Sequence, residues 1–183
     1  MSSKIGLGTV QFGLDYGINQ SKKVSFESIQ EIINFARSKN INTLDTASSY
    51  GDSEAVLGKV MVQDFNVITK TRHFNCVEIG DEEIDLFVND FRTSKNKLNV
   101  EYIYSLMIHN ADDLLKPGAN KLAQAIENLK NNGSIKKFGV SIYDEDQLQR
   151  ILDKFSIDLV QLPFNIFDNR LLKSGMLRRL HKL

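Results

Sequence analysis

Four side chains that can carry a proton or a charge stand where strand-like runs of the sequence end. Asp45, Lys70 and His109 each follow a short run of mainly apolar residues, and Tyr50 lies five residues beyond Asp45 in a turn rich in Ser, Gly and Asp. If these runs are parallel strands of a barrel, their carboxyl ends open on one face, so the four side chains can converge there. They then form one candidate site.

These four groups fit a reaction in which a proton moves onto a carbonyl oxygen. A free tyrosine titrates at about pH 10, and a nearby lysine ammonium favours the phenolate, so we expect Lys70 to lower the pKa of Tyr50. Asp45 would supply the counter-charge that a buried lysine needs. His109 would orient the carbonyl or share the proton. Protonation by Tyr50 is what hydride transfer from a nicotinamide to the adjacent carbon requires.

Lys70 also allows a second chemistry, because a desolvated lysine at the end of a strand can form a Schiff base, as in aldolase-type barrels. The proximity that we expect for Asp45 argues against this hypothesis, since a paired lysine stays charged.

The elements that must position these residues alternate regularly between strand and helix. The expected strands are residues 5–10, 41–44, 65–69, 102–108, 137–141 and 159–162. Helical periodicity follows each of them, with helices that begin near Ser25, Ser53, Asp81, Leu122, Asp144 and Asp168. Six β/α units in a row indicate an α/β fold with a parallel sheet and helices outside it.

Two parallel architectures fit this pattern, and the strand ends favour a barrel. A (β/α)8 TIM barrel uses about 250 residues for eight units, so six units need about 186, and this chain has 183. An open doubly wound sheet fits the length as well. Its nucleotide-binding turn would carry G-x-G-x-x-G, but residues 6–11 read GLGTVQ and lack the third glycine. Each strand end carries a different polar residue, as in barrels.

Composition excludes several other classes of protein. Acidic and basic residues balance at 23 each, which argues against nucleic acid or an anionic membrane as the main partner. No apolar run approaches the roughly 20 residues that span a bilayer, and residues 1–5 lack a signal-peptide core, so we expect a cytoplasmic protein. The single cysteine, Cys76, and the lack of a Cys/His cluster predict no disulfide and no metal site.

The sequence resembles the aldo-keto reductases, which are NAD(P)H-dependent oxidoreductases on a (β/α)8 barrel. The resemblance runs in order along the chain and is carried by GLGTV (6–10), LDTASSYGDSE (44–54), ITKT (68–71), IHN (108–110), GVS (139–141) and VQLPFN (160–165). It implies that Tyr50 is the general acid, that Lys70 and Asp45 tune it, and that His109 orients the substrate.

The same resemblance implies where the cofactor, NADPH or NADH with NADPH favoured, would bind. Ser141 and Gln161 would hold the nicotinamide carboxamide, Gly8 and Thr9 would line the cofactor floor, and Asn165 is a weaker candidate. Ile142 stands where many members have an asparagine, which removes one amide contact. The loops that we expect over the mouth of the site carry Tyr16, Arg72, His73 and Phe74.

The sequence has no counterpart of strands seven and eight, which bind the phosphates and adenosine of the cofactor in this family. We therefore expect one partial barrel domain over residues 1–183, incomplete at its C-terminal end. Its two sheet edges would be exposed and could lead to homo-oligomers. The predicted function is reduction of a small aldehyde or ketone to an alcohol, and the alternative is a catalytically impaired, truncated member that acts as a binding or oligomerising protein.

Overall fold

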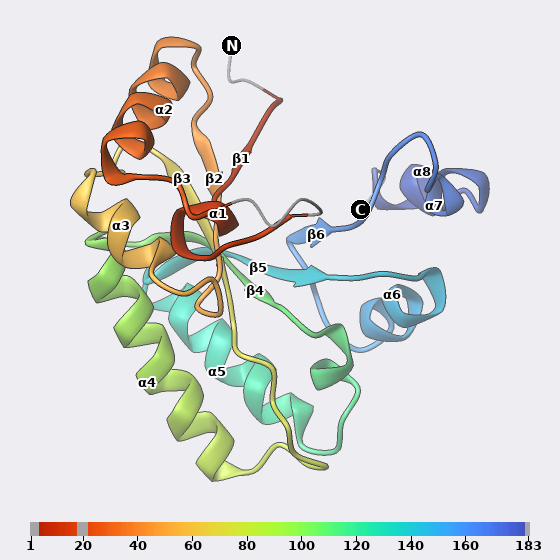
Figure 1. The fold of residues 1–183 in the computed structure, drawn as a ribbon. Coiled ribbons are helices and arrows are strands. Elements are labelled where there is room, and N and C mark those ends of the chain that lie inside the picture. The colour runs from red at the N-terminus through yellow and green to blue at the C-terminus, as the bar shows by residue number, and fades with distance from the viewer. Residues whose placement is uncertain (1–3, 18–21, 182–183) are drawn as a thin grey trace.

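The protein is built on one sheet of six parallel strands with helices along its outer side (Figure 1). The computed structural model describes residues 4–17 and 22–181. The strands are β1 (Leu7–Gly8), β2 (Thr43–Asp45), β3 (Asn66–Lys70), β4 (Ile103–Ile108), β5 (Ile135–Ser141) and β6 (Leu159–Gln161). The helices are α1 (Val10–Gly13), α2 (Phe26–Ser38), α3 (Ser53–Lys59), α4 (Asp81–Leu98), α5 (Ala119–Asn131), α6 (Glu145–Leu152), α7 (Arg170–Lys173) and α8 (Met176–Leu180), with a 3-10 helix, η1, at Ala111–Leu114.

The order of the strands decides between the two expected architectures. Each strand pairs with the next one along the chain, from β1 to β6. A doubly wound sheet reverses its strand order at a switch point, whereas a barrel keeps it. In Figure 1 the sheet curls, and α2, α3, α4 and α5 follow one another around its outer side. The prediction of a partial (β/α)8-type barrel with six units is therefore confirmed.

The apolar core lies between the sheet and these helices. Successive residues of a strand point to opposite faces, and one set of alternating positions is buried against the helices. This set includes Leu44, Val67, Leu106, Phe138 and Val140. Helix α2 contributes Ile29, Ile33 and Ala36, which share one face of the helix. The residues at the other alternating positions point to the opposite, inner face of the sheet.

Two helix starts that we expected from the sequence are held by side-chain caps. Ser25 Oγ accepts a hydrogen bond from the backbone N–H of Ser28 at 3.2 Å. Asp144 Oδ1 accepts one from the backbone N–H of Gln147 at 2.7 Å. Each cap satisfies a backbone donor that the first turn of a helix leaves free.

The two ends of the chain differ from expectation. We expected a strand over residues 5–10, but β1 is shorter because the chain turns at Thr9, whose backbone oxygen accepts from Phe12 N–H at 2.9 Å. We expected one helix from Asp168 onward, but it is divided into α7 and α8 at Gly175, where φ is +85°. A left-handed conformation of this kind ends a helix.

Within residues 4–17 and 22–181, no helix is long and apolar enough to cross a membrane. Residues 1–3, which belong to the segment expected to lack a signal-peptide core, lie outside the described residues, as do residues 18–21 and 182–183.

Candidate active site

The register of the sheet places the predicted site residues on one face. Paired residues of parallel strands point to the same side, and so do residues two apart in a strand. The register pairs are Gly8–Asp45, Asp45–Ile68, Lys70–Met107, Met107–Gly139 and Ser141–Gln161. Steps of two residues along a strand join these pairs. The inner face therefore carries Gly8, Asp45, Lys70, Ser141 and Gln161, with His109 directly after β4.

Lys70 and Asp45 form a largely buried ion pair at the ends of β3 and β2. Lys70 Nζ donates to Asp45 Oδ1 at 2.6 Å and to the backbone oxygen of Thr46 at 3.0 Å. The Lys70 side chain is 2% exposed and that of Asp45 is 24% exposed. Burial lowers the pKa of the Lys70 ammonium, while the Asp45 carboxylate opposes that change. Asp45 thus supplies the counter-charge for the buried lysine.

The ring of Tyr50 lies close to the Lys70 ammonium, with 5.2 Å between Nζ and the ring centroid. We expected this ammonium to lower the pKa of Tyr50. The pKa is instead raised to about 12, first by burial and then by the Asp45 carboxylate. The expectation failed because burial disfavours the charged phenolate, and because the Asp45 carboxylate offsets the charge of Lys70 at close range. Tyr50 therefore holds its proton at neutral pH.

His109 presents an uncharged imidazole beside Tyr50. The two rings meet edge to face, with centroids 6.1 Å apart, and Ser49 Oγ lies 3.5 Å from His109 Nδ1. Burial lowers the pKa of His109 to about 4, with further lowering from His73 and Lys70. A neutral imidazole has one donor and one acceptor nitrogen, so His109 can bind either end of a polarised carbonyl or hydroxyl group.

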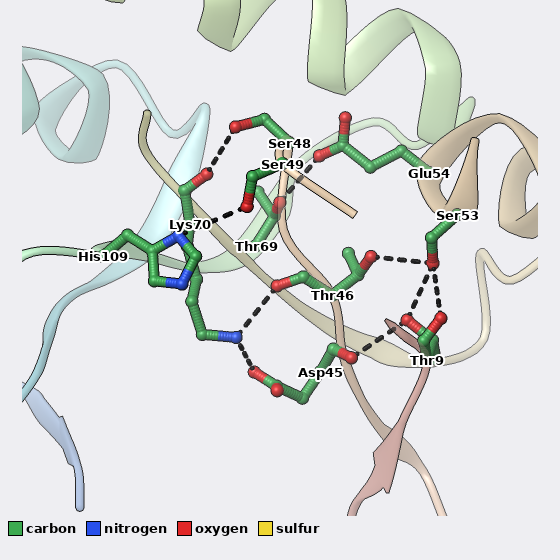
Figure 2. A network of polar contacts seen from close by, with 10 residues as sticks. All are labelled: Thr9, Asp45, Thr46, Ser48, Ser49, Ser53, Glu54, Thr69, Lys70 and His109. Atoms are coloured by element: carbon green, nitrogen blue, oxygen red, sulfur yellow. Dashed lines mark hydrogen bonds and ion pairs between the residues drawn. The ribbon is translucent and has the colours of Figure 1, made fainter. Parts of the chain in front are cut away.

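A buried network of hydroxyl groups fixes the segment that follows Tyr50 (Figure 2). Ser53 Oγ lies 3.0 Å from Thr46 Oγ1 and 2.9 Å from Thr9 Oγ1, and it donates to the backbone oxygen of Thr9 at 2.9 Å. Thr9 Oγ1 also donates to the backbone oxygen of Asp45 at 3.0 Å. All three hydroxyl residues are fully buried. The network fastens the start of α3 to the ends of β1 and β2.

A second buried contact fastens α3 to β3. Thr69 Oγ1 donates to Glu54 Oε1 at 2.7 Å, and Thr69 directly precedes Lys70. Burial raises the pKa of Glu54, while hydrogen bonds from Thr69 and Ser94 oppose the rise. The sequence interpretation gave the segment around Ser53 only a helix-capping role, because nothing in the local pattern shows which distant hydroxyls it meets.

Two glycines allow α1 to touch the loop of Tyr50. A Cβ on Gly13 would lie 1.8 Å from the backbone oxygen of Tyr50, so no other residue fits there without movement of the backbone. Gly51, directly after Tyr50, has a φ of +56° and faces the backbone of Gly13. The loop that carries the phenol is thus packed closely from the β1 side.

The residues predicted to hold a nicotinamide lie at the other end of the sheet. Ser141 and Gln161 are register partners on β5 and β6, and no hydrogen bond joins either side chain to another described residue. A Cβ on Gly8 would meet nothing within 4 Å. Two uncommitted polar side chains on adjacent strands of the inner face fit a flat amide group, because they leave hydrogen-bonding capacity for it, whereas Gly8 stands on β1 at the opposite edge of the sheet.

Three neighbouring residues are buried or hydrogen-bonded within the protein. Thr9, expected on the cofactor floor, is fully buried. Its hydroxyl lies in the network of Ser53 and holds the ends of β1 and β2 together. Ile142 is also fully buried. Asn165 Oδ1 accepts from the backbone N–H groups of Phe167 and Asp168 at 2.9 and 3.0 Å, which commits it to its own turn.

The loop residues expected over the mouth divide into two groups. Phe74 is buried, and the guanidinium of Arg72 pairs with Asp90 on α4. His73 reaches the site and packs against His109, and Tyr16 is close enough to contribute to the raised pKa of Tyr50. In the described part of the chain, no three His, Cys, Asp or Glu residues gather as a metal site requires.

Comparison with known proteins identifies the family of the chain. A sequence profile of the Aldo/keto reductase family matches residues 4–183. The chain is 31% identical over 139 residues to D-arabinose 1-dehydrogenase of Saccharomyces cerevisiae, which covers 70% of this chain and 41% of the relative. It is 26% identical over 190 residues to Aldo-keto reductase YhdN of Bacillus subtilis, with coverages of 94% and 53%. The chain thus spans about half the length of these curated relatives.

Solved structures show the same fold. The holo form of aldo-keto reductase AKR11C1 from Bacillus halodurans superimposes with a TM-score of 0.74 at 24% identity, over 98% of this chain and 59% of that one. The aldo-keto reductase AKR2E4 of Bombyx mori, in complex with NADP, gives a TM-score of 0.66 at 19% identity, over 94% and 59%. With the profile match over almost its entire length, this chain belongs to the aldo/keto reductase family.

Proposed function

We propose that the chain carries the proton-transfer half of an NAD(P)H-dependent oxidoreductase that reduces a small aldehyde or ketone to an alcohol. The observation that carries the proposal is the arrangement of Tyr50 beside the buried pair of Lys70 and Asp45, with His109 at the edge of its ring. Membership of the family supports the same reaction class.

In the proposed reaction, Tyr50 is the general acid. Its raised pKa keeps the proton on the phenol until the carbonyl oxygen becomes an alkoxide, which is basic enough to take it. The phenolate left behind faces the Lys70 ammonium, 5.2 Å from the ring centroid, whose charge opposes the unfavourable effects of burial and of Asp45 on the phenolate. Asp45 keeps that ammonium charged, and neutral His109 orients the carbonyl. The nicotinamide, when bound, supplies the hydride.

The cofactor side of the proposal rests on Ser141 and Gln161, which would hold the carboxamide, and on the open surface at Gly8. NADPH is the favoured form, with NADH as the alternative, and the NADP complex of the Bombyx mori neighbour is consistent with it. Ser141 and Gln161 would fix the plane of the carboxamide against the inner face of the sheet.

Of two other hypotheses, a Schiff base and a binding role, only the second has a structural feature in its favour. A Schiff base on Lys70 is disfavoured, because its ammonium is bonded to both Asp45 and the Thr46 carbonyl. A role as a binding or oligomerising protein has a specific feature in its favour. Phe164, Ile166 and Phe167 follow the edge strand β6 and are 58%, 85% and 94% exposed, an apolar surface of the kind that associates with other proteins.

The test is NADPH oxidation by the chain with a panel of aldehydes, alongside nicotinamide binding measured by fluorescence. We expect Tyr50→Phe to lower kcat/KM by at least about 100-fold, the usual share of a general acid, with cofactor binding unchanged. Tyr102→Phe, at the opposite end of β4, is the control and keeps its activity. Full activity of Tyr50→Phe would contradict the mechanism, and a chain that neither binds nor oxidises NADPH would favour the binding role.

A further inference from the structure

We propose that His73 is a positioning residue of this site, which holds the plane of the His109 ring by packing edge to face against it. The inference rests on the proposed function, since it assigns His73 a part in presenting His109 to the carbonyl. His73 itself lies in the loop between β3 and α4, 36 residues before His109 in the sequence.

The geometry of the two imidazoles carries the proposal. Their centroids are 4.6 Å apart with an interplanar angle of 81°, within the range of a favourable edge-to-face aromatic pair. The ring of Tyr50 is farther from His109, at 6.1 Å. His73 is therefore the closest aromatic neighbour of His109 in the part of the chain that the structure describes.

The backbone next to His73 is held by buried contacts, although the His73 side chain is exposed. The following residue, Phe74, is buried, and its backbone N–H donates to Asp113 Oδ2 at 3.3 Å. Lys116 Nζ donates to the Phe74 backbone oxygen and, at 2.6 Å, to Asp113 Oδ1. Asp113 is fully buried. The loop thus presents His73 from an anchored position.

Few other contacts fix the His109 ring. The Ser49 hydroxyl lies 3.5 Å from Nδ1, at the outer limit for a hydrogen bond, and it is exposed. The contact with Thr71 Oγ1 is made by the backbone N–H of His109, at 3.3 Å. A ring held by one long hydrogen bond needs packing to define its plane, and His73 supplies that packing. Ser49 beside Nδ1 leaves Nε2 for the substrate.

The second imidazole also affects the charge of His109. The titratable groups that face His109 are His73 on the loop, Lys70 on β3, Asp45 on β2 and Tyr50 after it. Burial lowers the pKa of His109 most, His73 and then Lys70 lower it further, and Asp45 raises it. Because His73 lowers the pKa of His109, removal of His73 should raise that pKa.

The test compares His73→Ala, His73→Phe and, as a remote control on the third histidine of the chain, His181→Phe. Proton NMR follows the Hε1 resonance of His109 through a pH titration. For His73→Ala we expect loss of the ring-current shift on His109 and a higher titration midpoint. His73→Phe keeps the ring-current shift, because it retains an aromatic edge, but also raises the midpoint. The His181 variant changes neither property.

The kinetic arm separates positioning from simple folding. With aldehyde and NADPH, we expect kcat of His73→Ala to fall on the order of 10-fold, as for a misplaced catalytic group, with KM nearly unchanged and substantial recovery in His73→Phe. An unchanged His109 resonance and midpoint in His73→Ala would overturn the proposal. If the wild-type chain reduces no carbonyl, the proposed function fails, while the NMR titration still decides whether His73 positions His109.

Discussion

The two ends of the curled sheet use their polar side chains in opposite ways. At the β1–β3 end, Lys70, Asp45 and Ser53 are bonded to one another or to their neighbours, mostly out of contact with solvent. At the β5–β6 end, the side chains of Ser141 and Gln161 have no hydrogen-bond partner among the described residues. The β1–β3 end is a framework of polar groups bonded to one another. The β5–β6 end is a surface whose polar side chains can still form hydrogen bonds.

The chain therefore organises the β1–β3 part of the site by its own contacts. Proton transfer needs fixed distances between groups, and the β1–β3 end fixes them with buried hydrogen bonds and an ion pair. The amide recognition that we propose for Ser141 and Gln161 needs free donors and acceptors, and the β5–β6 end keeps these two side chains free of partners among the described residues. Substitutions at the two ends should therefore differ in their effects on stability and on ligand binding.

Asp45→Asn should break the framework most severely. It leaves the Lys70 ammonium, 2% exposed, with a neutral partner, and loss of one member of a buried pair costs about 3–5 kcal/mol in the free energy of unfolding. Urea denaturation measures the change. The control is Asp64→Asn, which disrupts the more exposed pair with Arg37 and should cost less than about 1 kcal/mol. Equal effects of the two variants would contradict the special role of the buried pair.

Ser53→Ala should have the next largest effect. It removes the partner of the fully buried Thr46 hydroxyl, while the Thr9 hydroxyl keeps its hydrogen bond to the Asp45 backbone oxygen, and an unsatisfied buried group costs about 1–3 kcal/mol. Thermal unfolding measures the loss, and Ser49→Ala, at an exposed serine of the same loop, serves as the control. If both variants unfold at the wild-type temperature, the network does not support the loop of Tyr50.

His109 should make stability depend on pH in a defined window. Its pKa is lowered from 6.5 to about 4 in the folded chain, so between these values the unfolded state binds more protons and the free energy of unfolding falls as the pH falls. His109→Gln should therefore flatten the pH dependence between 6.5 and 4, by less than about 1 kcal/mol per pH unit because the ring is half exposed. His181→Gln is the control, and parallel curves for wild type and His109→Gln would rule the effect out.

Ser141→Ala and Gln161→Ala should have the smallest effect on folding. Because neither side chain has a hydrogen-bond partner within residues 4–17 and 22–181, we expect changes below about 0.5 kcal/mol in the free energy of unfolding. Affinity for the nicotinamide cofactor should fall several-fold in calorimetric titration, whereas Gln149→Ala on α6 leaves it unchanged. A large loss of stability would mean that the β5–β6 end is built like the other end, and the contrast would disappear.

Much of this architecture could be predicted from local patterns. Alternation of strand and helix segments predicted a parallel sheet with outer helices, since each strand run and each helix cap is encoded in a few neighbouring residues, as at Ser25 and Asp144. It left two strand orders open, and the polar residues at the strand ends favoured the barrel. The placement of Asp45 and Lys70 on one face followed from their positions at strand ends, because register in a parallel barrel is fixed by the hydrophobic pattern.

The remaining features depend on distances that no local pattern contains. Ser53 in its turn looks like any helix-capping serine, and only the folded chain brings Thr9 to it from 44 residues away. The direction of the pKa shift of Tyr50 depends on the balance between burial, Lys70 and Asp45, and burial is known only from packing. The contact of His73 with His109 is also a product of loop geometry.

The pairing of each strand with its predecessor has a consequence for biosynthesis. A sheet in sequential order can be extended by one strand at a time as the chain leaves the ribosome, because every new strand finds its neighbour already made. Tyr50 and the pair of Asp45 and Lys70 belong to the first three units, and His109 ends the fourth strand. The groups to which we assign proton transfer can therefore assemble on a nascent four-stranded sheet, before Ser141 and Gln161 have left the ribosome.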